Sequence, residues 1–361
     1  MELPKWADVV LIPVISLLLA AIISAIVFVG IGQDPVEALM LMVNGAFGSS
    51  NFTGYTLFYA TNFVFTGLAV AVAFHAALFN IGGEGQVLVG GLGAALACLF
   101  IPFPHWTLAL IGGSIAAMTF GALWIAIPAY LQARRGSHIV ITTIMFNFMA
   151  SGLLVFLLGG ALKPDGQMQT ATALFPEPTN LPLLEEVFAG IGITAFEDSP
   201  ANITILLALA ACVFVWALIW RTRFGYELRS FGKSESAAKY AGIDPIKITM
   251  FALLISGALA GLMAVNNTMG TLQPQLVDNA SGGAGFIGIA VALMGRNHPV
   301  GIAIAALLFG ALFQGGAELA AATGIPVQMV VVIQALVIMF TGALDNMVRR
   351  PLVGLFRKTG A

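Results

Sequence analysis

Long apolar segments alternate with short polar ones along the whole chain. Apolar residues dominate residues 9–31, 56–79, 87–103, 106–131, 139–162, 201–220, 248–267, 285–295, 299–320 and 326–344. A helix needs about 20 such residues to cross the hydrocarbon core of a bilayer, so the pattern predicts an all-α polytopic membrane protein with about ten transmembrane helices. The segment 285–295 is too short for a full crossing. Glycines lie around its start, at residues 282, 283 and 285, which favours a broken or tilted helix.

The start of the chain predicts a retained helix. Residues 9–31 form an apolar stretch longer than the roughly 7–15 residues of a signal-peptide core, and no small-residue cleavage pattern precedes residues 33–35. We therefore expect 9–31 to be the first transmembrane helix. Residues 35–47 are shorter and mixed in polarity, so we expect them to lie at a membrane interface.

Composition excludes a soluble globule. Of 361 residues, 59% are hydrophobic and 9% are charged, with a mean hydropathy of +0.97. A soluble domain carries about 25% charged residues, which it needs to cover its surface. The net charge of −2 gives no basic character that would suggest nucleic acid. Both cysteines, Cys98 and Cys212, lie inside apolar segments, so we interpret them as free thiols.

The distribution of charge predicts the orientation. Basic residues follow the predicted helices at 106–131 and 201–220 and end the chain, and with ten crossings these clusters fall on one side together with Lys5. Because positive charge marks the cytoplasmic side, both termini are predicted to be cytoplasmic. The loop 163–200 is acidic and proline-rich, which predicts an ordered outer cap. The basic residues are Arg134, Arg135, Arg221, Arg223, Arg229, Lys233, Lys239, Lys247, Arg349, Arg350, Arg357 and Lys358.

Polar residues interrupt the apolar pattern most sharply at residues 79–86. A carboxylate at bilayer depth costs about 2.5–3.5 kcal/mol on insertion scales, so Glu84 is interpreted as functional. Glycines beside it break regular helix and allow backbone groups to line a cavity. Lining of a path and capping of helix ends are both compatible with this pattern. Asn147 suits an interhelical hydrogen bond as well as a solute contact, and Gln314 lies four residues before Glu318, which also suits a structural pair. The candidate translocation-path residues are Asn80, Gly82, Gly83, Glu84, Gly85, Gln86, Asn147 and Gln314.

The basic loop 221–247 contains a second informative stretch. Ser234 can cap a short helix over residues 235–241, Gly242 can end that helix, and Asp244 with Pro245 can start the next one. Such an amphipathic helix on the cytoplasmic side suits docking of a soluble partner, and a solvated linker is the alternative.

Enzymatic chemistry and nucleotide binding find no support. The four histidines are far apart in the sequence, and no metal-ligand or nucleophile motif occurs. Gly232, Lys233 and Ser234 resemble the end of a phosphate-binding loop, but position 227, where that motif needs its first glycine, holds Glu227. We therefore predict no metal, no catalytic residue and no cofactor, with any ATP bound by a separate subunit.

Four motifs in this order are distinctive: FHAALFNIGGEGQ at 74–86, IVITTIMFN at 139–147, ESAAKYAGI at 235–243 and GFIGIAVALMGRNHP at 285–299. Together they resemble the permease subunit of bacterial ABC importers for nucleosides and simple sugars, which is related to ribose and branched-chain amino acid permeases. The resemblance runs from about residue 55 to residue 345.

The resemblance implies a single transmembrane permease domain, residues 1–361, in a bacterial inner membrane. It implies two ATPase subunits inside, a second permease subunit and an extracytoplasmic solute-binding protein as partners. It also implies two inverted repeats, with the breaks at 81–86 and 281–288 as counterparts. By resemblance, the residues that couple to the ATPase are Glu235, Ser236, Ala237, Ala238 and Gly242. A nucleoside is the favoured solute, and a ribose-like sugar is the alternative. The other classes of protein to exclude are a channel or secondary transporter and a membrane enzyme.

Overall fold

The chain is almost entirely helical. The computed structural model describes residues 12–325, 331–332 and 335–336, and within them it contains thirteen α-helices, one short 3₁₀ helix and two isolated β-bridges. The segment 326–344 that was predicted as the last transmembrane helix lies largely outside the described residues. The helices are α1 (Ile12–Gly30), α2 (Pro35–Phe47), α3 (Ser50–His75), α4 (Gly83–Phe100), α5 (Trp106–Arg135), α6 (Ile139–Gly159), η2 (Glu177–Thr179), α7 (Leu184–Ala189), α8 (Thr204–Arg221), α9 (Arg223–Lys233), α10 (Glu235–Tyr240), α11 (Pro245–Met269), α12 (Ala284–Met294) and α13 (Pro299–Thr323).

Seven of the helices within the described ranges are long and apolar enough to cross a membrane: α3, α4, α5, α6, α8, α11 and α13. An eighth span is counted if residues 21–30 of α1 and α2 form one bent segment, with an angle of 117° between them. The helix α12 has 11 residues and falls short of a crossing, as its sequence predicted. The prediction of an all-α polytopic membrane protein is confirmed.

The predicted start of α4 is wrong, and the difference concerns the candidate residues. The apolar pattern placed this helix at 87–103, whereas it begins at Gly83, so Glu84, Gly85 and Gln86 lie in its first turn. Polar residues are tolerated there because the first N–H groups of a helix have no partner within the helix, and a carboxylate is favourable at its positive end. The irregular segment is therefore shorter than predicted and ends at Gly82.

The chain divides into two compact units. The first consists of residues 1–52 and 311–361, and the second of residues 53–310. Within the first unit, Phe28, Ala38, Met42 and Leu319 form a buried apolar cluster. The helix α2 starts at Pro35, with Asp34 as its N-cap accepting hydrogen bonds from the N–H groups of Val36 and Glu37.

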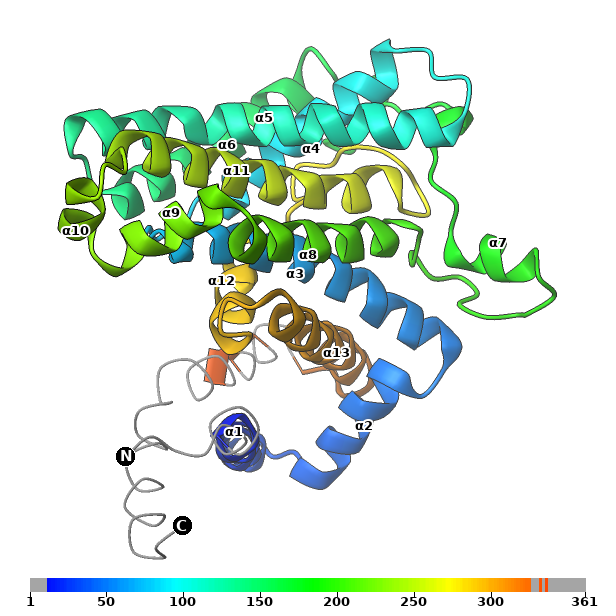
Figure 1. Cartoon of the computed structure of the whole chain (residues 1–361). Coiled ribbons are helices and arrows are strands. Elements are labelled where there is room, and N and C mark those ends of the chain that lie inside the picture. The colour runs from blue at the N-terminus through cyan, green and yellow to red at the C-terminus, as the bar shows by residue number, and fades with distance from the viewer. Residues whose placement is uncertain (1–11, 326–330, 333–334, 337–361) are drawn as a thin grey trace, which may run out of the picture. The chain divides into compact units, whose positions relative to one another are not determined.

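The core of the second unit is built from α3, α4 and α11, which are mostly buried, while α5, α6 and α8 leave most of their apolar stretches exposed. In Figure 1, α5 and α8 flank α11, which packs on α5 and α4. The helices α11 and α5 pack closely at Gly257 and Gly261, because a Cβ at either position would overlap a backbone carbonyl of α5, at Gly121 or Ala117 respectively. Small residues here let backbones approach, as is common between membrane helices.

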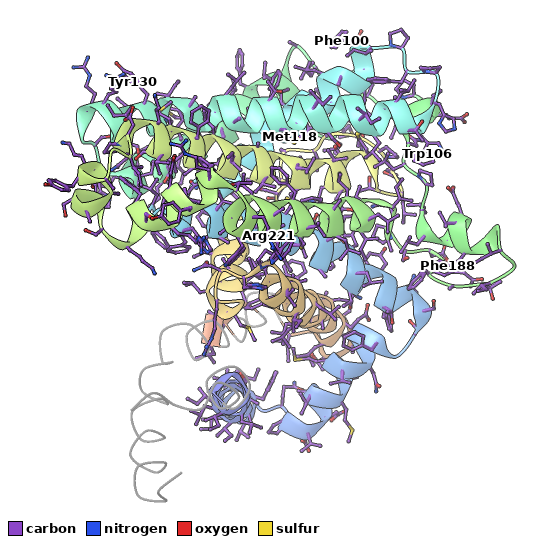
Figure 2. The ribbon with its side chains drawn as sticks, viewed as in Figure 1. Phe100, Trp106, Met118, Tyr130, Phe188 and Arg221 are labelled. Carbon is purple, nitrogen blue, oxygen red and sulfur yellow. The ribbon has the colours of Figure 1, made fainter. Side chains whose placement is uncertain are left out.

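Aromatic residues mark both ends of α5. Figure 2 shows Trp106 at one end of this helix and Tyr130 near the other, and Tyr130 is about half exposed. At 1.5 Å per residue the two residues lie about 36 Å apart along the axis. That span matches a hydrocarbon core of about 30 Å with an aromatic side chain at each interface.

The loop between α6 and α8 is ordered, as its prolines predicted. Its N–H groups at Thr172 and Phe175 donate to the carbonyl groups of Leu276 and Pro274, at 3.0 and 2.8 Å. These bonds connect the acidic loop with the segment between α11 and α12. The acidic loop therefore contacts the segment that leads into the short helix α12.

Candidate functional site

The candidate site is the pair of helix starts formed by α4 and α12, together with the segments before them. After α3 ends at His75, Ala77 takes a left-handed conformation with φ of 55° and the chain turns away from the helix axis. The N–H of Gln86 donates to the carbonyl of Gly82 at 3.0 Å and closes the first turn of α4. Before α12, Gly283 has φ of 80°, a conformation that glycine adopts without strain.

A buried amide pair holds the segment before α4. Asn80 and Gln86 are each 1% exposed, and their amides exchange two hydrogen bonds of 3.1 Å. Asn80 also donates to Oγ of Ser256 at 2.9 Å and accepts from the N–H of Gly82 at 2.9 Å. Ser256 in turn donates to the carbonyl of Ala69 at 2.6 Å. These bonds connect the irregular segment to α3 and α11, and they satisfy polar groups that would be costly to bury alone.

Asn147 on α6 bridges the same segment. Its Oδ1 accepts from the N–H of Gly85 at 2.9 Å, and its Nδ2 donates to the carbonyl of Ile81 at 2.9 Å. A single side chain thus pairs one N–H of the first turn of α4 with one carbonyl just before it. The bridge also explains the glycine at 85, because a Cβ there would lie 3.0 Å from Oδ1 of Asn147.

Glu84 connects the two helix starts. Its Oε1 accepts from the N–H of Gly283 at 3.0 Å, and its Oε2 accepts from the N–H of Gly285 at 2.9 Å. The carboxylate therefore lies at the positive end of α12 and satisfies two N–H groups that the helix itself leaves unpaired. The backbones are in contact as well: a Cβ at Gly285 would overlap the backbone nitrogen of Glu84, and one at Gly83 would lie 3.2 Å from the carbonyl oxygen of Gly285.

Seven of the eight predicted path residues therefore lie together: Asn80, Gly82, Gly83, Glu84, Gly85, Gln86 and Asn147. Gln314 belongs to the other compact unit, where its Nε2 donates to Oε1 of Glu318 at 3.4 Å. The amides and the carboxylate of the seven-residue group bond to other parts of the protein. That they line a translocation path stays a prediction, and Glu84 is only partly buried.

Sequence reasoning missed a second polar cluster, the asparagine network, which joins α3, α11 and the start of α8. Asn266 donates to Oδ1 of Asn62 at 2.8 Å and to the carbonyl of Phe58 at 3.1 Å. Its Oδ1 accepts from Asn202 at 2.8 Å and from Thr204 at 2.6 Å. Three separate segments contribute, so no local spacing marks the cluster. The asparagine pair at 266 and 267, at the end of the apolar stretch 248–267, was the available signal.

Asn267 extends the network to the segment before α12. It accepts from Asn62 at 2.8 Å and donates to the carbonyl of Ala280 at 2.6 Å. Two side chains thus position the start of α12. Glu84 bonds to Gly283 and Gly285, and Asn267 bonds to Ala280, which lies three residues before Gly283.

The predicted short helix in the basic loop is present. Ser234 caps α10 by accepting from the N–H of Ala237 at 3.3 Å, and Gly242 follows with φ of 83°. Asp244 caps α11 by accepting from the N–H groups of Ile246 and Lys247 at 2.9 and 3.4 Å. The loop is not a linker, because an unpredicted helix, α9, occupies residues 223–233. Glu235, Ser236, Ala237 and Ala238 all lie on α10, and only Ala238 of these is buried.

The helix α9 contacts the end of α3 that leads into the candidate site. A Cβ at Gly232 would overlap the carbonyl oxygen of His75, so the last turn of α9 lies directly against the last turn of α3. Four residues separate His75 from Asn80. The basic loop therefore touches the chain just before the buried amide pair.

Within the described part of the chain, no three His, Cys, Asp or Glu side chains are placed to hold a metal ion. The fold and the site define a polytopic all-α membrane protein. In it the start of the spanning helix α4 contacts the start of the short helix α12 through the carboxylate of Glu84. The profile of the protein family described as "Branched-chain amino acid transport system / permease component" matches residues 52–342. The chain belongs to this family of permease components.

Individual proteins similar to this chain are also permease proteins. The chain is 35% identical over 97% of each chain to the guanosine ABC transporter permease protein NupP of Bacillus subtilis. It is 33% identical to the nucleoside ABC transporter permease protein NupB of Lactococcus lactis, over 92% of this chain and 90% of that one. It is also 33% identical to the glucose ABC transporter permease protein TsgB13 of Haloferax volcanii, over 91% of this chain and 86% of that one. The prediction of a transport subunit rather than an enzyme is confirmed.

Each of these three organisms has a second, less similar permease protein named for the same solute, between 25% and 30% identical to this chain. Among solved structures, PsaBC from Streptococcus pneumoniae in complex with Fab matches with a TM-score of 0.45 and 14% identity, over 84% of this chain and 95% of that one. These two values are too low to establish a shared fold.

Proposed function

We propose that this chain is the membrane-spanning subunit of an ATP-driven importer and forms the path for a nucleoside. The observation that carries the proposal is its 35% identity, over 97% of each chain, to a guanosine permease. The candidate residues also favour an uncharged solute, because amides and glycine backbones outnumber charges there and binding along a path has to be weak. A simple sugar is the second candidate, supported by the similarity to a glucose permease.

The path in this proposal passes the paired helix starts of α4 and α12. Interrupted helices near the middle of a membrane are the usual location of transport sites, because they expose backbone groups to a cavity. In this proposal Asn80, Gln86 and Asn147 shape the segment, and Glu84 holds α12 against α4 without contacting the solute. The two starts are proposed to be counterparts in two inverted repeats, and their direct contact supports that pairing.

The partners in this proposal are two ATPase subunits, a second permease and an extracytoplasmic binding protein. The paired permeases in all three related organisms support a heterodimer of two similar chains. The short, capped and largely exposed helix α10 is the proposed ATPase contact, through residues 235–238 with Gly242 ending the turn. The basic residues on α9 and α10 support a cytoplasmic location for this loop and for both termini.

Copurification with the ATPase tests the coupling part of the proposal. We expect Glu235→Arg and Gly242→Val to lower the amount of bound ATPase and to abolish uptake, because the first reverses a charge on α10 and the second strains a left-handed turn. Glu177→Arg, an equal charge reversal in the loop 163–200, is the matched control and leaves both unchanged. Normal ATPase binding in both α10 variants would contradict the assignment, and uptake by the chain alone without ATP would favour a secondary transporter.

A further inference from the structure

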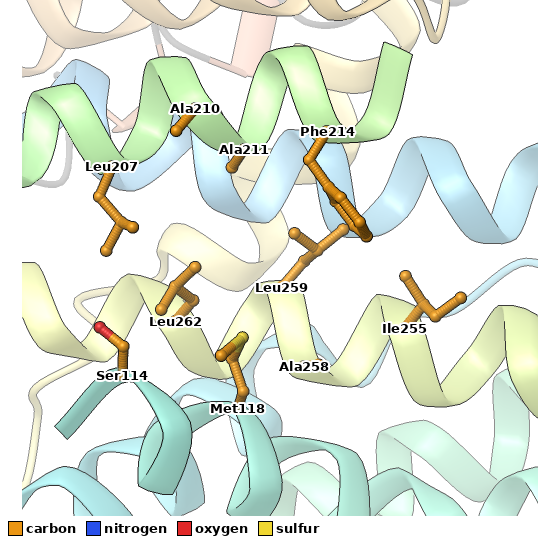
Figure 3. Close-up of a pocket in the computed structure, with 10 residues that line it drawn as sticks. All are labelled: Ser114, Met118, Leu207, Ala210, Ala211, Phe214, Ile255, Ala258, Leu259 and Leu262. Carbon is orange, nitrogen blue, oxygen red and sulfur yellow. The ribbon is translucent and has the colours of Figure 1, made fainter. Parts of the chain in front are cut away.

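An apolar cleft lies between α5, α8 and α11, away from the candidate site. Its volume is about 360 Å³, and Figure 3 shows Ala211 and Phe214 of α8 above Leu259 of α11, with Ser114 and Met118 of α5 below. The size falls in the range of ligand pockets, roughly 300–1,000 Å³. The cleft exists because alanines face it at 210, 211 and 258, where larger side chains would fill the gap.

The cleft lies at the depth of the hydrocarbon core. All three helices qualify as membrane spans. Ser114 and Met118 follow Trp106, which marks one end of α5, by about 12 and 18 Å along the helix axis. Phe214 lines the cleft and is 53% exposed, so the cleft opens onto the outer surface of the unit. The neighbouring residues Leu209 and Val213 of α8 are 52% and 64% exposed, as expected of side chains that face lipid.

The lining excludes water and polar solutes. Ser114 contributes the one polar side chain to the cleft, and its buried hydroxyl has no hydrogen-bond partner within the described residues. A bound water needs two to four polar partners, and a nucleoside or sugar needs more. A hydrocarbon chain needs none, and in a bilayer it is the material that borders an open apolar cleft.

We propose that this cleft binds one acyl chain of a membrane phospholipid. The chain enters from the lipid-facing side past Phe214 and fills the space between α8 and α11. Burial of its methylene groups against carbon atoms at packing distance supplies the attraction. Within the described residues the hydroxyl of Ser114 is already buried without a partner, so binding of an acyl chain costs it no hydrogen bond.

The test uses the full-length chain in nanodiscs that contain phosphatidylethanolamine with a diazirine on one acyl chain. After illumination, peptide mass spectrometry locates the labelled residues. We expect labelling of Met118, Leu207 and Leu262 above that of lipid-facing positions elsewhere. Ala210→Trp fills the mouth of the cleft and removes this excess, whereas Leu209→Trp, a bulky substitution one residue away outside the cleft, preserves it.

Ser114→Ala separates an acyl chain from a polar ligand. Removing the hydroxyl preserves the labelling if the occupant is hydrocarbon, because a hydrocarbon forms no hydrogen bond with it. Loss of labelling in Ser114→Ala would overturn the proposal, since it would mean a ligand held by that hydroxyl. Even labelling over all lipid-facing residues, unchanged by Ala210→Trp, would overturn it. Loss of the excess labelling when the second permease is assembled with this chain in the nanodisc would also overturn it, because the cleft would then be a contact between the two chains.

Discussion

Replacing Glu84 by glutamine tests how the two helix starts are held together. The carboxylate accepts two backbone hydrogen bonds, from Gly283 and Gly285, at 3.0 and 2.9 Å. Bonds to a charged group contribute about 1.5–3 kcal/mol each, so the pair contributes roughly 3–6 kcal/mol. Glutamine keeps one acceptor oxygen, worth about 0.5–1.5 kcal/mol, and turns an amide N–H₂ toward the second N–H. The expected loss is roughly 2–5 kcal/mol of contact between α4 and α12.

The assay is uptake of radiolabelled guanosine by cells that express the importer with each variant, alongside thermal unfolding of the purified protein. We expect Glu84→Gln to retain part of the transport and to unfold several degrees lower, and Glu84→Ala to lose more of both, because it satisfies neither N–H. Glu37→Gln, which removes an exposed carboxylate from the first turn of α2, is the control and has little effect on either. If Glu84→Gln were as inactive as Glu84→Ala while it assembled and unfolded like the wild type, the charge itself would be required for transport and the positioning role would be refuted.

Close contacts and buried hydrogen bonds give three further predictions. Uptake is expected to be lost in Gly83→Leu, Gly85→Leu and Gly285→Ala, because each added side chain meets backbone atoms or Asn147. The control is Gly152→Ala on α6, whose side chain points into open space and retains uptake, and equal uptake in all four variants would contradict the close packing. Asn266→Ala should lower the free energy of unfolding by about 1–3 kcal/mol, because its partners lose their hydrogen bonds. Thermal unfolding measures this with Asn180→Ala as the control, and an unchanged midpoint would mean that the asparagine network contributes nothing to stability. Gly232→Val should keep ATPase binding but uncouple ATP hydrolysis from uptake, because the new side chain displaces α9 from the carbonyl of His75. The control is Lys233→Val, on the exposed side of α9, and normal coupling in Gly232→Val would mean that the contact between α9 and α3 does not couple ATP hydrolysis to uptake.

Local patterns predicted most of the helices. Apolar length located α3, α5, α6, α8, α11 and α13 to within six residues at each end, because a membrane span needs a continuous apolar run. The caps at Ser234 and Asp244 and the turn at Gly242 were also predictable, because each depends on a side chain or glycine beside the helix it serves. The helix α9 was not, because its charged residues resemble those of a solvated loop.

The site was predictable only in part. The break before α4 and the glycines before α12 were visible as polar or flexible interruptions, but their contact through Glu84 joins residues about 200 positions apart. For the same reason the bond from Asn147 to Gly85 could be foreseen as an interhelical bond and not as a bridge to this segment. The asparagine network was missed because its segments are far apart in the sequence and show no shared spacing.

Solute uptake by the reconstituted importer tests the central claim most directly. The chain is coexpressed with its second permease and ATPase subunits and incorporated into proteoliposomes, and the binding protein is added on the side where it docks. We predict ATP-dependent accumulation of radiolabelled guanosine, blocked by excess unlabelled nucleoside and not by glucose. Accumulation of glucose in place of guanosine would contradict the solute assignment, and accumulation of guanosine without ATP would contradict the ATP-driven mechanism.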